Sequence, residues 1–255
     1  MTTPTARIAL ITGASRGLGR SSALKLAEQG VDVIITYKSN ETEAQAVVRQ
    51  IEALGRRAVA LKLDVADSST FAAFAEQVKH ALANTWQREH IDYLVNNAGN
   101  GIYASFAETT EEQFDLLANV HLKGTFFLTQ KLLPLIRDGG RIVNTSSGLT
   151  RFTFLGYAAY AAMKAGIEVL TRYMAKELGA RGISVNTIAP GAIETDFGGG
   201  VVRDDSNTNA HIAGATALGR VGLPDDVGGA IAALLSDGTH WINGQRIEVS
   251  GGMML

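Results

Sequence analysis

The 255-residue sequence contains no cysteine. Disulfides, thiolate catalysis and cysteine-ligated metals are therefore excluded, and a cytoplasmic location is the simpler expectation. The five histidines are scattered and show no metal-site spacing, so no metal is expected. No stretch approaches about 18 uninterrupted apolar residues. The polar start MTTPTAR does not resemble a signal peptide, so we expect no membrane partner.

The sequence also has no large excess of positive or negative charge. Lysine and arginine total 23, aspartate and glutamate total 25, and the formal net charge is −2. This balance provides no broad basic surface, so we expect no binding to nucleic acid through bulk charge. Hydrophobic residues make up 46% of the chain, which is typical of a folded globular protein.

Short apolar runs alternate with longer amphipathic segments along the chain. The expected strands are residues 7–12, 32–36, 57–63, 91–97, 141–146, 183–189 and 245–250. Helical patterns lie between them, at residues 17–29, 41–54, 68–84, 111–135, 158–180 and 225–235. Several strands are apolar nearly throughout, as in a parallel sheet covered on both faces. The alternation predicts one α/β domain over residues 1–255, a Rossmann-type doubly wound parallel sheet of about seven strands with helices on both faces.

One long segment, residues 196–216, lacks a clear pattern. Its GGG and DDSNTN stretches are loop signals. A connection this long in a compact domain is typical of a functional lid, and we predict a lid over the substrate site. A passive surface loop is the alternative.

Three glycines stand where the first strand gives way to the first helix. Gly13 follows the strand, and Gly17 and Gly19 fall at the helix start. Glycine permits positive φ and lets a ligand approach the backbone. The following helix start offers free N–H groups to a pyrophosphate. The G-x-x-x-G-x-G spacing therefore favours a dinucleotide site, although a plain strand-to-helix turn would look similar.

The residues after the second strand indicate which dinucleotide binds. An NAD site normally places a carboxylate there for the ribose hydroxyls. Residues 36–40 contain none, and Asp32 lies at the wrong end of the strand. Arg16 and Lys38 are instead two cations positioned to meet a 2′-phosphate. We therefore predict NADP(H) rather than NAD(H).

A tyrosine and a lysine stand at i and i+4 on a predicted helix. Tyr160 and Lys164 are neighbours on one helix face. A nearby ammonium favours the phenolate, so Lys164 is expected to lower the pKa of Tyr160 and suit it to proton transfer. Ser146 and Ser147 end the fifth strand, at the edge where ligands of such sheets bind. A core tyrosine beside a surface lysine is the alternative interpretation.

Taken together, these motifs resemble the short-chain dehydrogenase/reductase family from about residue 7 to the end. TGASRGLG (12–19), NNAG (96–99), YAAMK (160–164) and APGAIETD (189–196) match its motifs in order. Within the family, the chain resembles the branch of 3-oxoacyl-(acyl-carrier-protein) reductases. The resemblance implies a cofactor site formed by Gly13, Ser15, Arg16, Gly17, Leu18, Gly19, Lys38, Ser39, Asp64, Val65, Asn97, Gly99, Tyr160, Lys164, Pro190, Gly191, Ile193 and Thr195.

The resemblance also implies the chemistry, a hydride transfer between nicotinamide and a carbonyl or alcohol carbon. Tyr160 would donate or accept the proton. Lys164 would lower the pKa of Tyr160 and bind the nicotinamide ribose, and Ser147 would orient the substrate oxygen. Ser147 is preferred to Ser146 because it lies 13 residues before Tyr160, the usual separation. Asn119, in LLANVHLKG, would hold a water that links Lys164 to solvent.

The substrate is left open at this point. A ketone or 3-oxoacyl reductase is expected, with a sugar, polyol or secondary-alcohol dehydrogenase as the alternative and a non-catalytic cofactor sensor as a remote one. Aromatic residues near the expected pocket favour an apolar substrate: Phe152, Phe154, Tyr157 and Phe197. Arg137 and Arg181 are candidates to dock an acyl-carrier protein. Apolar helix faces and the terminal GGMML favour a homotetramer.

Overall fold

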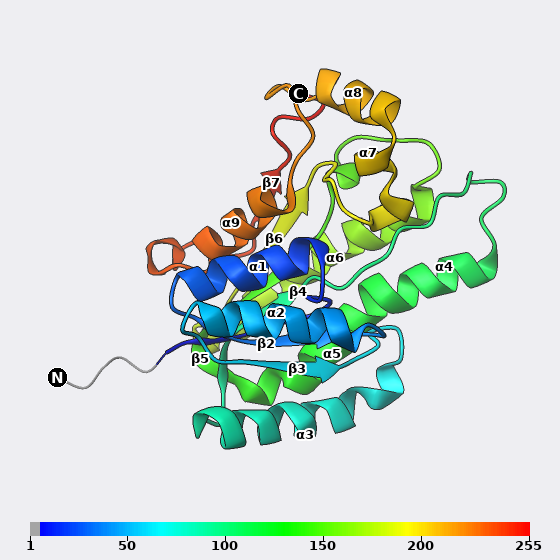
Figure 1. Cartoon of the computed structure of the whole chain (residues 1–255). Helices are drawn as coiled ribbons and strands as arrows, with labels where there is room; N and C mark the ends of the chain where they lie inside the picture. The colour runs from blue at the N-terminus through cyan, green and yellow to red at the C-terminus, as the bar shows by residue number, and fades with distance from the viewer. Residues whose placement is uncertain (1–5) are drawn as a thin grey trace.

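Seven parallel strands form one sheet in the computed structural model, which describes residues 6–255. The strands are β1 (Ile8–Ile11), β2 (Asp32–Tyr37), β3 (Ala58–Lys62), β4 (Ile91–Asn96), β5 (Ile136–Thr145), β6 (Ser184–Pro190) and β7 (Arg246–Val249). Their order across the sheet is β3-β2-β1-β4-β5-β6-β7. The predicted Rossmann-type sheet is therefore confirmed (Figure 1).

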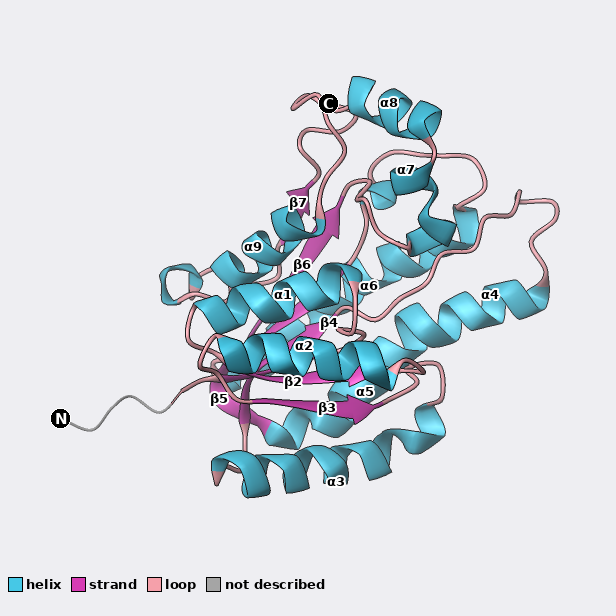
Figure 2. Cartoon of the chain, viewed as in Figure 1, coloured by secondary structure: helices cyan, strands magenta, loops and turns pink. Residues whose placement is uncertain are grey.

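The sheet lies between two layers of helices (Figure 2). The helices are α1 (Gly17–Glu28), α2 (Glu41–Ala53), α3 (Phe71–Ala81), α4 (Glu111–Leu117), α5 (Gly124–Leu132), α6 (Ala158–Leu178), α7 (Val201–Asp204), α8 (Ser206–Gly214) and α9 (Pro224–Leu234). Side chains of α1, α2 and α9 share one hydrophobic core, and those of α3, α5 and α6 share the other. Both faces of the sheet are thus covered, as the apolar strands predicted.

Strand β1 shows how one short sequence serves both layers. Ile8 and Leu10 belong to the core under α3, whereas Ala9 and Ile11 belong to the core under α1. All four are fully buried. Because successive side chains of a strand point to opposite faces, only a run that is apolar throughout can occupy this place.

The helix expected over residues 111–135 is interrupted. It comprises α4, a π-helical segment Ala118–Lys123, α5 and a short 3₁₀ turn. Gly124 lies at the interruption, where an added Cβ would come within 2.3 Å of the Val65 carbonyl oxygen. The helix can therefore pass this close to the end of β3 only with glycine at that position.

Strand β5 also differs from the sequence prediction, because it begins at Ile136 rather than at residue 141. Ile136 pairs with Ile91, and the register then shifts before Tyr93 pairs with Arg141. The intervening residues 137–139 are exposed, and Gly139 adopts a φ of +74°. The first residues of β5 are polar and irregular, so they lack the apolar pattern by which a strand is recognised in a sequence.

The segment 196–216 is not the loop that its composition suggested. It contains a 3₁₀ turn followed by α7 and α8, at the end of the molecule where the C-terminus lies (Figure 1). Glycines 198–200 all adopt positive φ and form a turn before α7. The Asp205 side chain then caps α8 by accepting from the Thr208 backbone N–H. Among residues 6–255, no helix is long and apolar enough to cross a membrane.

Candidate active site

A cleft of about 980 Å³ opens at the carboxyl edge of the sheet. It lies where β1 adjoins β4, the point at which the strand order reverses and ligands of such sheets bind. Every residue predicted to contact the cofactor lines this cleft except Gly19. The sequence motifs, which are far apart along the chain, therefore meet in one place.

The glycines form a cradle at the floor of the cleft. Gly13 adopts a φ of +64°, and an added Cβ there would lie 2.9 Å from the Cα atom of Ala98. Gly19 packs inside the turn, where an added Cβ would come within 2.5 Å of the Gly13 carbonyl oxygen. Gly19 is thus required for packing, and its contact with a cofactor stays a prediction. The strand-to-helix turn can hold its shape only with glycine at these positions.

Helix α1 begins at this cradle with its first N–H groups available to an anion. Its N-cap residue, Arg16, forms no side-chain capping hydrogen bond, and the first turn contains no acidic residue. A helix start with these features is suited to a phosphate group. The residues present therefore fit the pyrophosphate of a dinucleotide.

The ribose end of the cleft carries the two predicted cations. Lys38 Nζ lies 2.8 Å from Asp64 Oδ2, and Arg16 Nη1 lies 3.3 Å from Asp196 Oδ2. Both cations are exposed and line the cleft. Asp32 lies at the far end of β2, where it is fully buried and paired with Arg56 and Arg57. The prediction that Asp32 cannot reach a ribose is confirmed.

Three of the four predicted catalytic residues meet in the cleft: Ser147, Tyr160 and Lys164. The Tyr160 ring is buried, and the Ser147 side chain lies near enough to affect the pKa of its hydroxyl. Lys164 Nζ lies 5.6 Å from the centroid of the Tyr160 ring and donates to the Thr145 carbonyl at 2.7 Å. Helix α6 thus presents Tyr160 and Lys164 on one face, toward the serine that follows β5.

Burial changes the pKa values in a way that the sequence did not predict. Burial raises the pKa of the Tyr160 phenol, and the hydrogen bond with Ser147 offsets only part of that effect. Burial also lowers the pKa of Lys164 to about 7. The expected lowering of the Tyr160 pKa by Lys164 is therefore absent here. Tyr160 is protonated at neutral pH, which is the form that donates a proton.

The fourth predicted residue, Asn119, does not line the cleft, whereas His121 does. The buried positions from Leu117 to Leu132 are Leu117, Val120, His121, Gly124, Leu128, Thr129 and Leu132. They follow the i, i+3, i+4, i+7 spacing of one helix face, and Asn119 lies off that face. This periodicity was the sequence signal that would have identified His121.

His121 is a buried neutral imidazole against Tyr160. Its ring meets the Tyr160 ring edge-on at a centroid distance of 5.1 Å. Nε2 lies 2.8 Å from the Asn100 carbonyl oxygen, and because a carbonyl can only accept, Nε2 carries the proton. Burial, followed by the nearby charge of Lys164, lowers the pKa of His121 to about 3. His121 therefore cannot serve as an acid at neutral pH.

Aromatic and aliphatic side chains form the remaining wall of the cleft. All four aromatic residues singled out in the sequence line it: Phe152, Phe154, Tyr157 and Phe197. The Phe197 ring meets the Tyr160 ring at a centroid distance of 5.5 Å, so part of the segment 196–216 packs against Tyr160. Met253, from the carboxyl-terminal tail, completes this wall and is 1% exposed. Met253 thus inserts into its own chain.

Comparisons with known proteins agree with this arrangement. A family model described as enoyl-(acyl carrier protein) reductase matches residues 13–254. Hydroxynaphthalene reductase-like protein Arp2 of Metarhizium brunneum is 36% identical over 258 residues, covering 96% of this chain and 94% of that protein.

Two solved structures extend the comparison. The promiscuous reductase LugOII, which catalyses keto-reduction at C1 during lugdunomycin biosynthesis, has a TM-score of 0.93 and 36% identity, covering 99% of this chain and all of the other. The angucycline C-6 ketoreductase LanV, with bound NADP, has a TM-score of 0.92 and 33% identity, covering 97% of this chain and 95% of the other. The similarity therefore extends over nearly the whole length of this chain.

Proposed function

The chain belongs to the short-chain dehydrogenase/reductase family, and from that premise we propose that it is an NADP(H)-dependent ketone reductase. The observation that carries the proposal is the meeting of Ser147, Tyr160 and Lys164 in the cleft that also holds the glycine cradle. At neutral pH the Tyr160 phenol is protonated, which is the form that donates a proton to a carbonyl oxygen during reduction.

The chain's own residues orient the substrate and supply the proton. NADPH, when bound, supplies the hydride. Tyr160 donates its proton to the carbonyl oxygen, and the Ser147 hydroxyl donates a hydrogen bond to the same oxygen. Lys164 is the neighbouring basic group that can resupply the proton. Asn119 does not itself line the cleft, and its role in holding a water that links Lys164 to solvent stays a prediction.

Arg16 and Lys38 are proposed to hold the 2′-phosphate of NADP(H). Each is exposed and already paired with a carboxylate at the rim of the cleft. Exposed ion pairs contribute little stability, so a phosphate can replace the carboxylate at small cost. The related ketoreductase LanV was solved with bound NADP, which supports the same preference here.

The proposed substrate is a ketone on a fused aromatic ring system. The wall beside Tyr160 consists of aromatic rings in edge-to-face contact, with Tyr157 at 6.4 Å and Phe197 at 5.5 Å from the Tyr160 ring. Such rings favour flat aromatic ligands. The names of the related proteins, among them a hydroxynaphthalene reductase-like protein and an angucycline ketoreductase, support the same class.

A parallel assay tests this function. We expect NADPH to be consumed with a bicyclic aromatic ketone at a kcat/KM about 10-fold above that for a short 3-oxoacyl thioester, because each added aromatic contact strengthens binding. A matched reaction with NADH should be much slower. A thioester that outperforms every aromatic ketone would overturn the substrate assignment, and no reduction of any ketone would overturn the function.

Docking of an acyl-carrier protein is not part of the proposal. Arg137 and Arg181 lie near the start of β5, whereas the cleft opens at the carboxyl edge of the sheet. Arg137 pairs with Asp92, and Arg181 pairs with Asp138. These arginines serve ion pairs at the opposite edge, so a free small molecule is the proposed substrate.

We also propose a homotetramer. Helices α4, α5 and α6 carry exposed large apolar side chains: Phe114, Phe126, Phe127, Val169 and Tyr173. Exposed apolar side chains of this size are typical of a subunit interface. Sedimentation velocity should therefore show a species of four chains, and a stable monomer at micromolar concentration would refute this. The cytoplasmic location stays a prediction.

A further inference from the structure

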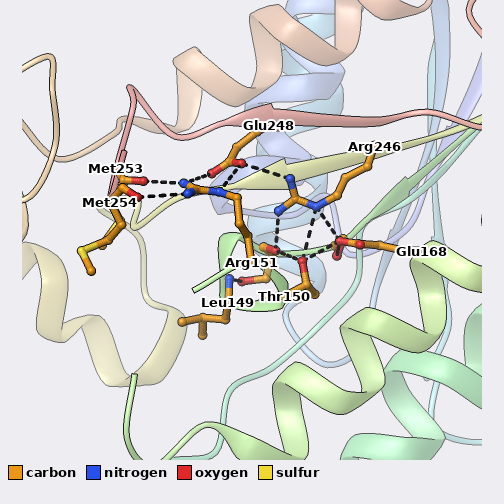
Figure 3. Close-up of polar contacts among 10 residues, drawn as sticks. Leu149, Thr150, Arg151, Glu168, Arg246, Glu248, Met253 and Met254 are labelled. Atoms are coloured by element: carbon orange, nitrogen blue, oxygen red, sulfur yellow. Dashed lines mark hydrogen bonds and ion pairs between the residues drawn. The ribbon is translucent and has the colours of Figure 1, made fainter. Parts of the chain in front are cut away.

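Four alternating charges connect three distant segments beside the cleft. Figure 3 shows Arg246 between Glu168 and Glu248, and Arg151 between Glu248 and the tail. Arg246 Nε lies 2.8 Å from Glu168 Oε1, and Arg246 Nη1 lies 3.0 Å from Glu248 Oε2. Arg151 binds both oxygens of Glu248 at 2.8 Å. We call this row, Glu168–Arg246–Glu248–Arg151, the charge clamp.

One end of the charge clamp holds the turn that contains Ser147. The hydroxyl groups of Ser146 and Thr150 each lie 2.7 Å from Glu168 Oε1, and Arg246 Nη2 donates to the Ser147 carbonyl at 3.3 Å. Ser147 is therefore held at its own carbonyl and through the side chains of Ser146, directly before it, and Thr150, three residues after it. Its own Oγ accepts from the Leu149 backbone N–H at 3.2 Å, which leaves the hydroxyl proton free for the cleft.

Glu168 is placed for this task by helix α6. It follows Lys164 by four residues and Tyr160 by eight, so all three lie along one helix face. The helix thus presents the proton donor and, two turns later, the carboxylate that holds the serine turn. A shift of Glu168 changes the distance between Ser147 and Tyr160.

The other end of the charge clamp holds the carboxyl-terminal tail. Arg151 donates to the Met254 carbonyl at 3.0 Å and to the Met253 carbonyl at 2.6 Å. Its guanidinium also lies over the Phe152 ring, 5.3 Å from the centroid. Met253 and Phe152 both line the substrate side of the cleft. Arg151 therefore sets the position of that wall.

Glu248 joins the two ends, since it binds both arginines. These guanidiniums hold the pKa of Glu248 below its usual value although partial burial opposes that shift. The carboxylate is thus charged at neutral pH, and its hydrogen bonds to arginine are of the strong, charge-assisted kind. The serine turn and the tail are connected through one ionised side chain.

We propose that the charge clamp is a positioning device for catalysis, in which Glu168 and Arg246 hold Ser147 against Tyr160 while Arg151 and Glu248 hold the Met253 wall against the substrate. This inference rests on the proposed reductase function. It assigns different kinetic effects to the two ends. Loss of the serine end lowers kcat, and loss of the tail end raises the KM for the ketone.

Steady-state kinetics of three variants test the assignment. Glu168→Gln and Arg246→Met should each lower kcat roughly 10-fold, the effect of losing a charge-assisted hydrogen bond, with the KM for NADPH unchanged. Arg151→Met should raise the KM for the ketone roughly 10-fold and alter kcat much less. Equal kcat losses in all three variants would overturn the division of roles.

Arg181→Met is the matched control. Arg181 is also an arginine held by a carboxylate and by backbone carbonyls, but at the opposite edge of the sheet. It should leave both kinetic constants unchanged. If Arg181→Met lowers kcat as much as Arg246→Met, the effect is general destabilisation and the proposal fails. Glu168→Gln preserves side-chain size, so the test survives even if an arginine variant unfolds.

Amide hydrogen exchange separates failure of the charge clamp from failure of the proposed function. Without any assay of activity, Glu168→Gln should accelerate exchange in residues 146–151, and Arg151→Met should accelerate it in residues 251–255. If the protein reduces no ketone but the variants still show these local changes in exchange, the proposed function is wrong and the charge clamp is still supported. Unchanged exchange in both peptides would overturn the clamp whatever the substrate.

Discussion

Replacing Tyr160 with phenylalanine is expected to lower turnover at least about 100-fold, the scale of general acid catalysis. The substitution removes the hydroxyl that is proposed to donate the proton and leaves the ring. That ring packs edge-on against His121 and Phe197, so the cleft should keep its shape. Binding of NADPH, measured by fluorescence titration, should stay close to that of the wild type.

Tyr157→Phe is the natural control for this experiment. Tyr157 lines the same cleft one turn earlier, with its ring 6.4 Å from that of Tyr160, but it has alanine rather than lysine four residues later. We expect this variant to retain most of its turnover. Normal turnover by Tyr160→Phe, or equal losses in both variants, would remove Tyr160 from the role of proton donor.

Replacing Arg16 and Lys38 together with alanine should lower kcat/KM for NADPH by about 100-fold, since two charge-assisted hydrogen bonds to the phosphate are lost. The reaction with NADH should change little, because its ribose carries no phosphate for these cations. The ratio of kcat/KM with NADPH to kcat/KM with NADH, measured for the variant and the wild type, gives the change in cofactor preference directly.

Arg20→Ala controls for the loss of positive charge near the cleft. Arg20 is an exposed cation of α1 that contacts Gln50 and does not line the cleft. Its removal should leave the preference for NADPH intact. If the Arg16 and Lys38 variant keeps the wild-type ratio of the two rates, the phosphate is held by other groups and this assignment is wrong.

Much of the fold could be predicted because it depends on local patterns. Strands such as β1 and β6 must be apolar on both faces, and that requirement is visible in the sequence itself. The cofactor cradle was predictable for a similar reason, since Gly13 and Gly19 are positions where the backbone geometry leaves room for no other residue. The pairing of Tyr160 with Lys164 follows directly from helical spacing.

The errors arose where distant segments decide the local structure. The close approach of Gly124 to Val65 accompanies the break in the predicted helix and cannot be seen from either segment alone. His121 lines the cleft because it lies on the buried face of its helix, whereas Asn119 does not line the cleft, and the role expected for Asn119 stays a prediction. The prediction for the pKa of Tyr160 was wrong for the same reason. Its sequence neighbour Lys164 suggested a lower value, and burial, a property of the whole fold, raised it.

The position of β1 in the sheet has a consequence for how the chain folds. β1 pairs with β2 on one side, which follows it closely, and with β4 on the other, where Ala9 meets Tyr93. During synthesis the first three strands can associate while the second edge of β1 stays open, and closing so long a loop is slow. An open strand edge also invites aggregation. The arrival of β4 closes that edge and, through Asn97 and Ala98, completes the cradle against Gly13. The segment from β4 to Ala98 therefore supplies both the second neighbour of β1 and one wall of the cofactor cradle.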